Sequence, residues 1–232
     1  MVNFRGFTLH FACVITVDIK GSKKLKDRAV IQNEILNLLS NLNKKFSDHI
    51  IADFMITLGD EFQGVLKNTK PILKIFKYIK ENLPVEFYCG VGVGSIETPL
   101  SRKPSEMDGS AFHRSREALE EAKKKRIEIV FKSDHEEIDF PLNSIMELIL
   151  YVQNKWTKRQ REVISFLESQ KDVNLSVVAK HFQVSKQAIS KIIRAAGWKA
   201  VRKAEKVVEH YLELLEQGKP YMVNHLKSTT RG

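Results

Sequence analysis

Residues 10–19, HFACVITVDI, form an almost continuous apolar run that is rich in β-branched side chains and interrupted near its end by Asp18. A strand with one solvated face alternates apolar and polar residues, and this run does not alternate. It is therefore predicted to be a central strand buried on both faces. Gly21 then opens a turn.

Outward from this strand, apolar residues recur at helical spacing in some segments, and β-rich runs occupy others. The pattern predicts helices over residues 28–46, 71–83 and 110–125, and strands over residues 51–58, 61–67, 85–94 and 126–131. Gly59 and Asp60 separate two of the strands and suit a tight hairpin. The order β-α-β-β-α-β-α-β predicts an α+β fold with a ferredoxin-like layer, in which helices cover one face of a mostly antiparallel sheet.

A change of pattern marks the domain organisation. Residues 132–141, KSDHEEIDFP, are polar and acidic and close with Pro141, so we interpret them as a linker. The pattern beyond them is purely helical. We expect an α/β domain over residues 1–131 and an all-α domain over residues 142–232.

The net charge of +10 is unevenly distributed along the 232 residues. Residues 1–140 carry 22 Lys+Arg and 20 Asp+Glu, whereas residues 141–232 carry 16 and 8. A basic C-terminal segment favours a polyanionic partner, most often nucleic acid. A solvated helical surface is the alternative interpretation.

Cysteine usage and hydropathy bear on the cellular compartment. Cys13 and Cys89 both stand in apolar runs, which indicates buried and reduced thiols. The longest apolar runs fall well short of the roughly 20 residues that span a bilayer. The first apolar segment has no small-residue cleavage site. We expect a cytoplasmic protein.

Three carboxylates stand where strands are predicted to begin or end. Asp18 closes the first strand, and Asp60 and Glu61 lie at the hairpin. If these strands are neighbours, Asp18 and Asp60 meet, and paired carboxylates are hard oxygen ligands for Mg²⁺ or Mn²⁺, which bind phosphates. The alternative is that Asp60 and Glu61 are ordinary turn residues and that Asp18 meets another partner or solvent.

Four short motifs carry a resemblance to known families: VDIKGS (17–22), GDEFQ (59–63), GVGVGSIET (90–98) and DGSAFHRSREAL (108–119). Their order and spacing resemble the class III nucleotidyl cyclases. GDEF is also similar to the signature of the diguanylate cyclases, although Leu58 replaces its first glycine. Over the full chain, including its helical tail, the sequence resembles the SatD family.

The cyclase resemblance implies a set of site residues. Asp18 and Asp60 match the two metal-ligating aspartates, the backbone of Ile19 matches a further ligand, and Glu61 stands beside them. The turn after the first strand would lie near the triphosphate of a nucleotide, through Lys20, Gly21, Ser22 and Lys23.

The same resemblance marks departures in the third predicted helix. His113 stands where cyclases have their transition-state Asn, and Glu117 stands where they have an Arg. Arg116 is adjacent but out of register, so His113 and Arg116 are the candidate catalytic residues. These departures favour nucleotide binding over cyclisation. Class III cyclases work as dimers, so the resemblance also suggests a homodimer.

Residues 175–197, LSVVAKHFQVSKQAISKIIRAAG, have the layout of a helix-turn-helix. Ser185 is placed to cap the second helix, and Gln183 stands where glycine is common. The outer face of that helix would present Lys186, Gln187, Ser190, Lys191 and Arg194, all of which can donate to bases or phosphates. Residues 157–169 would form a supporting helix, and residues 200–217 a helix suited to packing or dimerisation. A helical protein-interaction module is the alternative to DNA binding.

Two functions from different classes follow from this sequence. The first is a DNA-binding regulatory protein whose N-terminal domain senses a nucleotide or a metal ion. The second is an enzyme, a nucleotidyl cyclase or nucleotidyltransferase, with the helical tail as an accessory. A third interpretation is a cyclase-like domain that serves only protein contacts.

Overall fold

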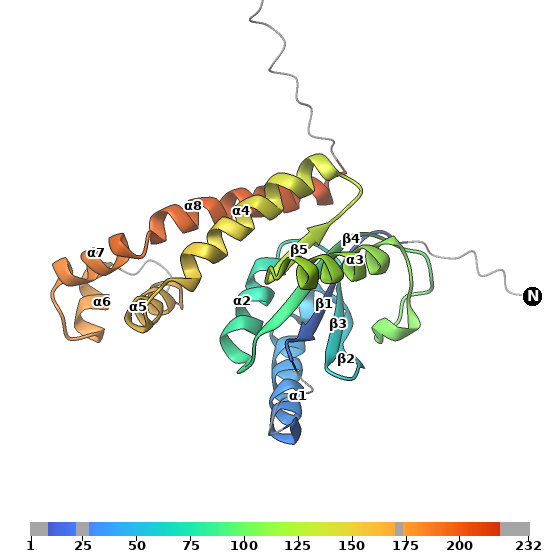
Figure 1. Cartoon of the computed structure of the whole chain (residues 1–232), viewed down its shortest axis with the longest axis horizontal. Helices are drawn as coiled ribbons and strands as arrows, with labels where there is room; N and C mark the ends of the chain where they lie inside the picture. The colour runs from blue at the N-terminus through green and yellow to red at the C-terminus, as the bar shows by residue number, and fades with distance from the viewer. Residues whose placement is uncertain (1–8, 22–27, 170–173, 219–232) are drawn as a thin grey trace, which may run out of the picture. The chain divides into compact units, whose positions relative to one another are not determined.

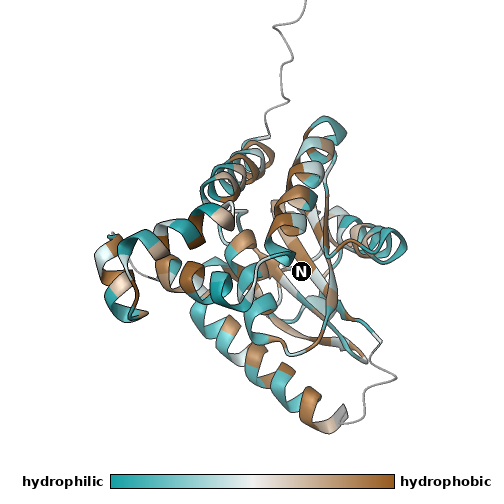
Figure 2. Ribbon diagram, turned by 60° about the vertical axis from the view of Figure 1, so that its left-hand side comes forward, coloured by the Kyte–Doolittle hydropathy of each residue, from teal (hydrophilic) through white to brown (hydrophobic). Residues whose placement is uncertain are grey.

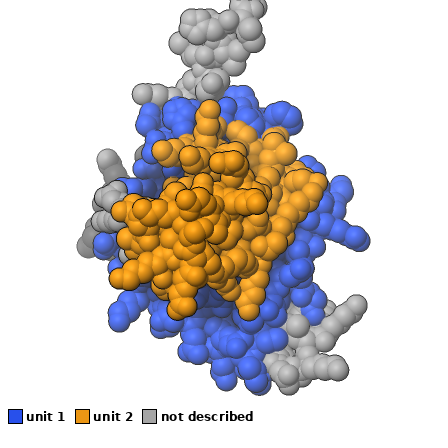
Figure 3. Space-filling model, turned by 90° about the vertical axis from the view of Figure 1, so that its left-hand side faces the viewer, with its two compact units in different colours: residues 1–143, 209–232 blue, residues 144–208 orange. Residues whose placement is uncertain are grey.

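The computed structural model describes residues 9–21, 28–169 and 174–218. The chain divides into two compact units (Figure 3). Unit 1 comprises residues 1–143 and 209–232, and unit 2 comprises residues 144–208. Both boundaries fall inside helices, because α4 (Glu136–Asn154) and α8 (Trp198–Glu216) each belong partly to both units.

Unit 1 is built on a five-stranded sheet with the order β2-β3-β1-β4-β5. The strands are β1 (Leu9–Ile19), β2 (Ile50–Leu58), β3 (Glu61–Leu66), β4 (Phe87–Ile96) and β5 (Ile129–Lys132). β4 and β5 are parallel, and the other neighbours are antiparallel. The predicted α+β class, the mostly antiparallel sheet and the element order are thereby confirmed. β1 is the central strand, and the side chains of Cys13, Ile15 and Val17 on it are buried.

Three longer helices accompany the sheet: α1 (Arg28–Lys45), α2 (Ile72–Asn82) and α3 (Ser110–Lys125), with short 3-10 turns at Ser47–His49 and Pro104–Glu106. α2 buries Ile72, Ile75, Phe76 and Ile79 on one side. The helices carry hydrophobic residues on one side and hydrophilic residues on another (Figure 2). The helical spacing of apolar residues in the sequence therefore predicted where these helices lie along the chain.

The helices do not all cover one face of the sheet, so that part of the ferredoxin-like expectation was wrong. Successive residues of a strand point to opposite faces. Thr16 points toward α3, because its hydroxyl shares a hydrogen bond with that of Ser115. Ile19 points to the other face, and its cross-strand neighbour Phe87 packs edge-on against Phe76 of α2. α2 and α3 thus lie on opposite faces (Figure 1).

Three glycines of β4 explain why α3 can pack on that face. A Cβ at Gly90, Gly92 or Gly94 would fall within 3.0 Å of backbone atoms of α3. At Gly92 the colliding atoms are the carbonyl oxygen of Ala111 and the amide nitrogen of Ser115. The glycine repeat therefore serves close helix packing and not a phosphate-binding loop. This close contact sets the distance between α3 and the sheet.

The segment expected to be a linker, residues 132–141, is largely structured. Lys132 ends β5, and α4 already begins at Glu136. The carboxylate of Asp139 accepts hydrogen bonds from the backbone N–H and the hydroxyl of Ser133, at 2.7 and 2.8 Å. The acidic residues that made this segment look like a solvated connection instead occupy the first turn of a helix, where negative charge is favourable. Pro141 lies inside α4.

Unit 2 is helical. Besides its parts of α4 and α8 it contains α5 (Lys158–Ser169), α6 (Leu175–His181) and α7 (Lys186–Ala195). Its core contains Val163, Val178, Ala179, Ile189 and Ile193. The indole N–H of Trp156 donates to the backbone oxygen of Ala196 at 2.7 Å and ties the start of α5 to the end of α7.

Among the described residues, no helix has the length and apolar composition that crossing a membrane requires. Cys13 and Cys89 are free thiols, and both are buried. Burial raises the pKa of both thiols, so they stay protonated and unreactive. The interpretation of both residues as buried, reduced cysteines is confirmed.

Candidate functional site

The predicted acidic residues meet at the ends of β1 and β3. The antiparallel register places Asp18 directly opposite Glu61. Gly59 makes the turn before them with φ +62°, a conformation that suits glycine. Asp18 lies two residues from Thr16, so the carboxylates of Asp18 and Glu61 share the face that α3 covers.

Glu61 is held tightly within this cluster. Its side chain is only 5% exposed, and the guanidinium of Arg116 binds both of its carboxylate oxygens, one of them at 2.8 Å. The hydroxyl of Thr57 adds a hydrogen bond at 3.2 Å. Hydrogen bonding to Glu61 raises the pKa of Arg116, so the guanidinium stays charged. The oxygens of Glu61 are therefore occupied by the protein itself.

Asp18 is less fully compensated. Its side chain is 24% exposed, and one carboxylate oxygen lies 3.4 Å from the ammonium of Lys123, which Glu120 also approaches at 3.2 Å. The pKa of Asp18 is raised above its ordinary value, mainly because burial disfavours the charged form. Lys123 opposes that rise, while the neighbouring charges of Asp60 and Glu61 add to it.

Asp60 lies at the tip of the hairpin and is only partly buried. Its negative charge adds to the rise in the pKa of Asp18 that burial causes. Within the described part of the chain, no group of three or more His, Cys, Asp or Glu side chains is arranged to hold a metal ion. The arrangement is thus an acidic pair, Asp18 and Asp60, beside a third acid that Arg116 neutralises.

The residues expected near a triphosphate are only partly described. Lys20 lies 3.4 Å from a carboxylate oxygen of Glu86, and its ammonium sits 4.4 Å from the ring centre of Tyr88. Gly21 is exposed and turns with φ +65°. Ser22 and Lys23 lie outside the described residues. The backbone of Ile19 ends β1 beside Asp18, as the strand-end prediction required.

The two candidate catalytic residues have different surroundings. Arg116 contacts Glu61 in the acidic cluster, as described above. His113 lies one helical turn earlier on α3, with its side chain 72% exposed and its ring nitrogen 3.5 Å from a carboxylate oxygen of Asp108. The structure therefore connects Arg116 with the acids and shows His113 beside a different one.

Some residues of this cluster were not predicted from the sequence. Lys123 was not among the predicted site residues, yet it pairs with Asp18. A buried ladder runs beneath α3, in which the amide of Gln63 donates to Thr16 at 2.8 Å and Thr16 bonds to Ser115. The two-residue period of the strands contained the signal, since Thr16 and Gln63 stand two positions from Asp18 and Glu61.

Unit 2 presents a second candidate surface on α7. Four residues, 182–185, separate α6 from α7, and Gln183 among them adopts a left-handed conformation with φ +53°. The hydroxyl of Ser185 accepts the amide N–H of Ala188 at 3.1 Å and caps α7. Ile189 and Ile193 face the core.

The side of α7 away from that core carries the residues that were expected to contact DNA. Lys186, Gln187, Lys191 and Arg194 are exposed, and Ser190 is partly exposed. Within the described residues, the side chains of Lys186, Lys191 and Arg194 form no ion pair. This surface therefore offers three uncompensated cations and two neutral hydrogen-bonding groups on one helix face.

Several solved structures resemble part of the chain. A bacterial light-regulated adenylyl cyclase has 12% identity and a TM-score of 0.40, covering 64% of this chain and 81% of its own. The adenylyl cyclase CyaB from P. aeruginosa has 17% identity and a TM-score of 0.36, covering 50% and 74%. A microbial GGDEF domain has 16% identity and a TM-score of 0.36, covering 54% and 78%.

A search of curated proteins gave no match. A family model gives the clearest relationship. Residues 12–212 match the model described as the SatD family, a span that includes most of both units. The match agrees with the resemblance seen in the sequence over the full chain. The chain belongs to the SatD family.

Proposed function

We propose that this protein is a DNA-binding regulatory protein that contacts duplex DNA through the outer face of α7. The observation that carries the proposal is the exposed row of Lys186, Gln187, Lys191 and Arg194, opposite the buried Ile189. Lysine and arginine bind phosphates, while glutamine and arginine also make bidentate contacts with base edges. A helix with such a face suits the major groove.

The charge of unit 2 supports this proposal. Residues 144–208 carry 13 Lys+Arg against 5 Asp+Glu, so almost the whole net charge of +10 belongs to the smaller unit. A positive surface attracts duplex DNA over a distance and contributes a salt-dependent share of the affinity.

The local architecture supports it as well. The connection between α6 and α7 is short, as the proposed helix-turn-helix requires, and it contains the left-handed Gln183 and the capping Ser185. The ring of Phe182 in this connection lies 4.5 Å beneath the guanidinium of Arg159, which also donates to the carbonyl of Phe182 at 3.3 Å. These contacts attach the connection between α6 and α7 to α5.

Selection from a random duplex pool, using the full chain, tests the proposal. We expect enrichment of a defined sequence, with two half-sites about 10 base pairs apart if the protein is a homodimer. Arg194→Ala should relax the preference at one base position by about 1–3 kcal/mol. Lys191→Ala should weaken binding to all sequences alike. Failure to enrich any sequence would leave α7 as a protein-contact surface.

A second function, nucleotide binding with Mg²⁺ or Mn²⁺ in unit 1, is supported by the raised pKa of Asp18 beside Asp60. A cation at this pair would relieve the repulsion between the two carboxylates. Mg²⁺ commonly uses one or two carboxylates together with phosphates of its ligand, which two acids suffice to provide. Such binding would make unit 1 a sensor for the DNA-binding unit.

Calorimetry with each nucleoside triphosphate and Mn²⁺ tests this second function. Asp18→Asn and Asp60→Asn should each weaken Mn²⁺-dependent binding, whereas Asp48→Asn, at an exposed carboxylate elsewhere in unit 1, should not. The alternative, an active nucleotidyl cyclase or nucleotidyltransferase, predicts a cyclic or transferred product that mass spectrometry detects. The exposed His113 and the engaged Arg116 favour weak or absent catalysis.

A further inference from the structure

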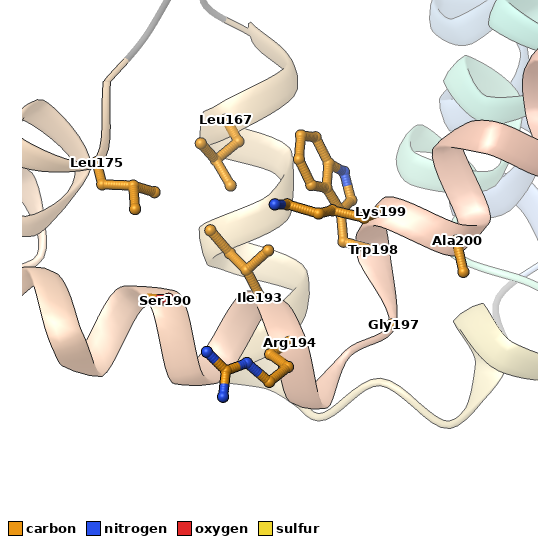
Figure 4. A pocket seen from close by; sticks show the side chains of 9 residues that line it. All are labelled: Leu167, Leu175, Ser190, Ile193, Arg194, Gly197, Trp198, Lys199 and Ala200. Atoms are coloured by element: carbon orange, nitrogen blue, oxygen red, sulfur yellow. The ribbon is translucent and has the colours of Figure 1, made fainter.

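A groove of about 540 Å³ lies within unit 2, between α5, the start of α6, α7 and the start of α8 (Figure 4). Its volume is within the range of about 300–1,000 Å³ that small-molecule sites occupy. No residue of the acidic cluster takes part in it, so it is separate from the candidate nucleotide site. The groove therefore needs its own explanation.

The walls of the groove are apolar. Leu167, Leu175, Ile193 and Trp198 line it. The indole ring of Trp198 is fixed, because its N–H donates to a carboxylate oxygen of Glu168 at 3.0 Å. A fixed aromatic wall beside aliphatic side chains is suited to the flat or hydrocarbon part of a ligand.

Two cations complete the lining. Arg194 lies in the last turn of α7, and Lys199 lies in the first turn of α8, after a bend at Gly197, where φ is +65°. In Figure 4 the ammonium of Lys199 points into the groove beside Leu167. Neither cation forms an ion pair with any residue that the structure describes. Apolar walls with two uncompensated positive charges are complementary to an apolar molecule that carries one negative group.

We infer that this groove binds a small carboxylate with an aromatic or alkyl body. The carboxylate would lie between Arg194 and Lys199, and the body would lie on Trp198 and the aliphatic wall. Charged hydrogen bonds to a guanidinium are short and strong, which gives the site its preference for an anion over a neutral analogue.

The position of Arg194 gives this site a regulatory consequence, which rests on the proposed function. Arg194 belongs both to the groove and to the exposed face of α7. A carboxylate that pairs with its guanidinium competes with DNA for the same group. Ligand binding should therefore weaken DNA binding, and DNA should weaken ligand binding by the same factor.

Calorimetry on the full chain tests the groove without DNA. The probes are indole-3-acetate and octanoate, and the neutral controls are indole-3-acetamide and octanol. We expect the two anions to bind and the neutral molecules to bind at least about tenfold more weakly, which corresponds to about 1.4 kcal/mol. Equal affinity for the anions and their neutral analogues would overturn the inference, as would an absence of binding by both anions.

Matched variants locate the binding site. Arg194→Ala and Lys199→Ala should each lower anion affinity about tenfold or more, because each removes a charge-assisted contact. Lys203→Ala and Lys206→Ala remove exposed cations elsewhere on α8 and should leave affinity unchanged. Leu175→Trp, which fills the groove and keeps both cations, should abolish binding, with circular dichroism confirming that the variant is folded. Unchanged binding in Leu175→Trp would place the ligand elsewhere.

DNA competition separates this inference from the proposed function. If the anions bind to the groove but no duplex is retained, the groove stands and the DNA proposal fails. If duplex DNA binds and the anions do not, the DNA proposal stands and the inference about the groove fails. If both bind without competing, the shared role of Arg194 is wrong.

Discussion

Asp18 and Glu61 face each other across two strands, but their charges are compensated to different degrees. Arg116 grips both oxygens of Glu61, and Thr57 adds a third contact. Among the described residues, Asp18 forms an ion pair with Lys123, which Glu120 also approaches. One acid is thus a structural ion pair. The other is a partly buried carboxylate that can still accept a cation or a hydrogen-bond donor.

Burial has a predictable effect on stability at Asp18. The pKa of Asp18 is higher in the folded chain than in the unfolded chain, so the folded chain binds the proton more tightly. The resulting stabilisation is fully present below the unfolded pKa and is lost as the pH rises through the folded pKa. At neutral pH the ionised Asp18 therefore opposes folding.

We accordingly expect Asp18→Asn to raise the midpoint of thermal unfolding at pH 7. The gain over the unmodified chain should shrink as the pH falls toward about 4, near the ordinary pKa of aspartate. Differential scanning calorimetry over this pH range measures it. Asp48→Asn, at an exposed carboxylate, is the control for the loss of one negative charge and should change little. A loss of stability at pH 7 would show that Asp18 stabilises the fold.

At the scale of elements, the contact between α3 and β4 determines the geometry of the acidic cluster. Arg116, Glu120 and Lys123 recur along one stripe of α3, and the helix can hold them over the strand ends only while it packs on the glycines of β4. The glycine repeat therefore acts on the site from a distance, by setting how closely α3 approaches the sheet.

Gly92→Ala tests that role through the sign of its effect. In a strand without a packed helix, alanine is more favourable than glycine by roughly 0.5–1 kcal/mol. Here the added Cβ meets backbone atoms of Ala111 and Ser115, and such overpacking typically costs about 1–3 kcal/mol. We expect chemical denaturation to show a net loss of stability. A gain in stability would mean that α3 is not held against β4.

The cap of α7 provides a second test at this scale. Ser185→Ala removes the hydrogen bond to the N–H of Ala188 and should reduce the stability of the fold by about 1 kcal/mol. Ser190→Ala is the matched control, because Ser190 lies within the same helix and caps nothing. Urea titration of both variants compares the losses. Equal losses would argue against capping as the cause.

The sequence predicted these elements well because their signals are local. Apolar spacing located the five strands and most of the helices but not α4, and the Gly59 hairpin was recognisable from two residues. Strand parity alone could have placed Asp18, Thr16 and Glu61 on one face. Long-range packing decides which face of the sheet α3 covers. The sequence therefore could not predict that α3 lies over these acids or that Lys123 pairs with Asp18. Residues 132–141 were predicted to be a linker because linkers and the first turns of helices are both rich in acidic residues.

At the scale of the whole molecule, the charge is segregated between the two units. Unit 2 holds 13 Lys+Arg against 5 Asp+Glu, while the rest of the chain holds 25 against 23. Solubility alone does not require that positive charge be concentrated in one unit. This segregation is the distribution expected when one unit associates with a polyanion and the other does not.

The central claim is that duplex DNA binds to the outer face of α7. The most direct test is the salt dependence of duplex binding by the full chain, measured by fluorescence anisotropy from about 50 to 200 mM salt. Two triple variants remove equal charge: Lys186→Ala, Lys191→Ala and Arg194→Ala from α7, and Lys44→Ala, Lys70→Ala and Lys74→Ala from exposed positions of unit 1.

The unmodified chain should lose affinity steeply as salt rises, because bound cations release counterions from DNA. The α7 variant should bind much more weakly and show a slope smaller by about 3, roughly 1 for each cation that contacts a phosphate. The unit 1 variant should keep the original slope. An absence of duplex binding by the unmodified chain at about 50 mM salt, or equal weakening in both variants, would contradict the claim.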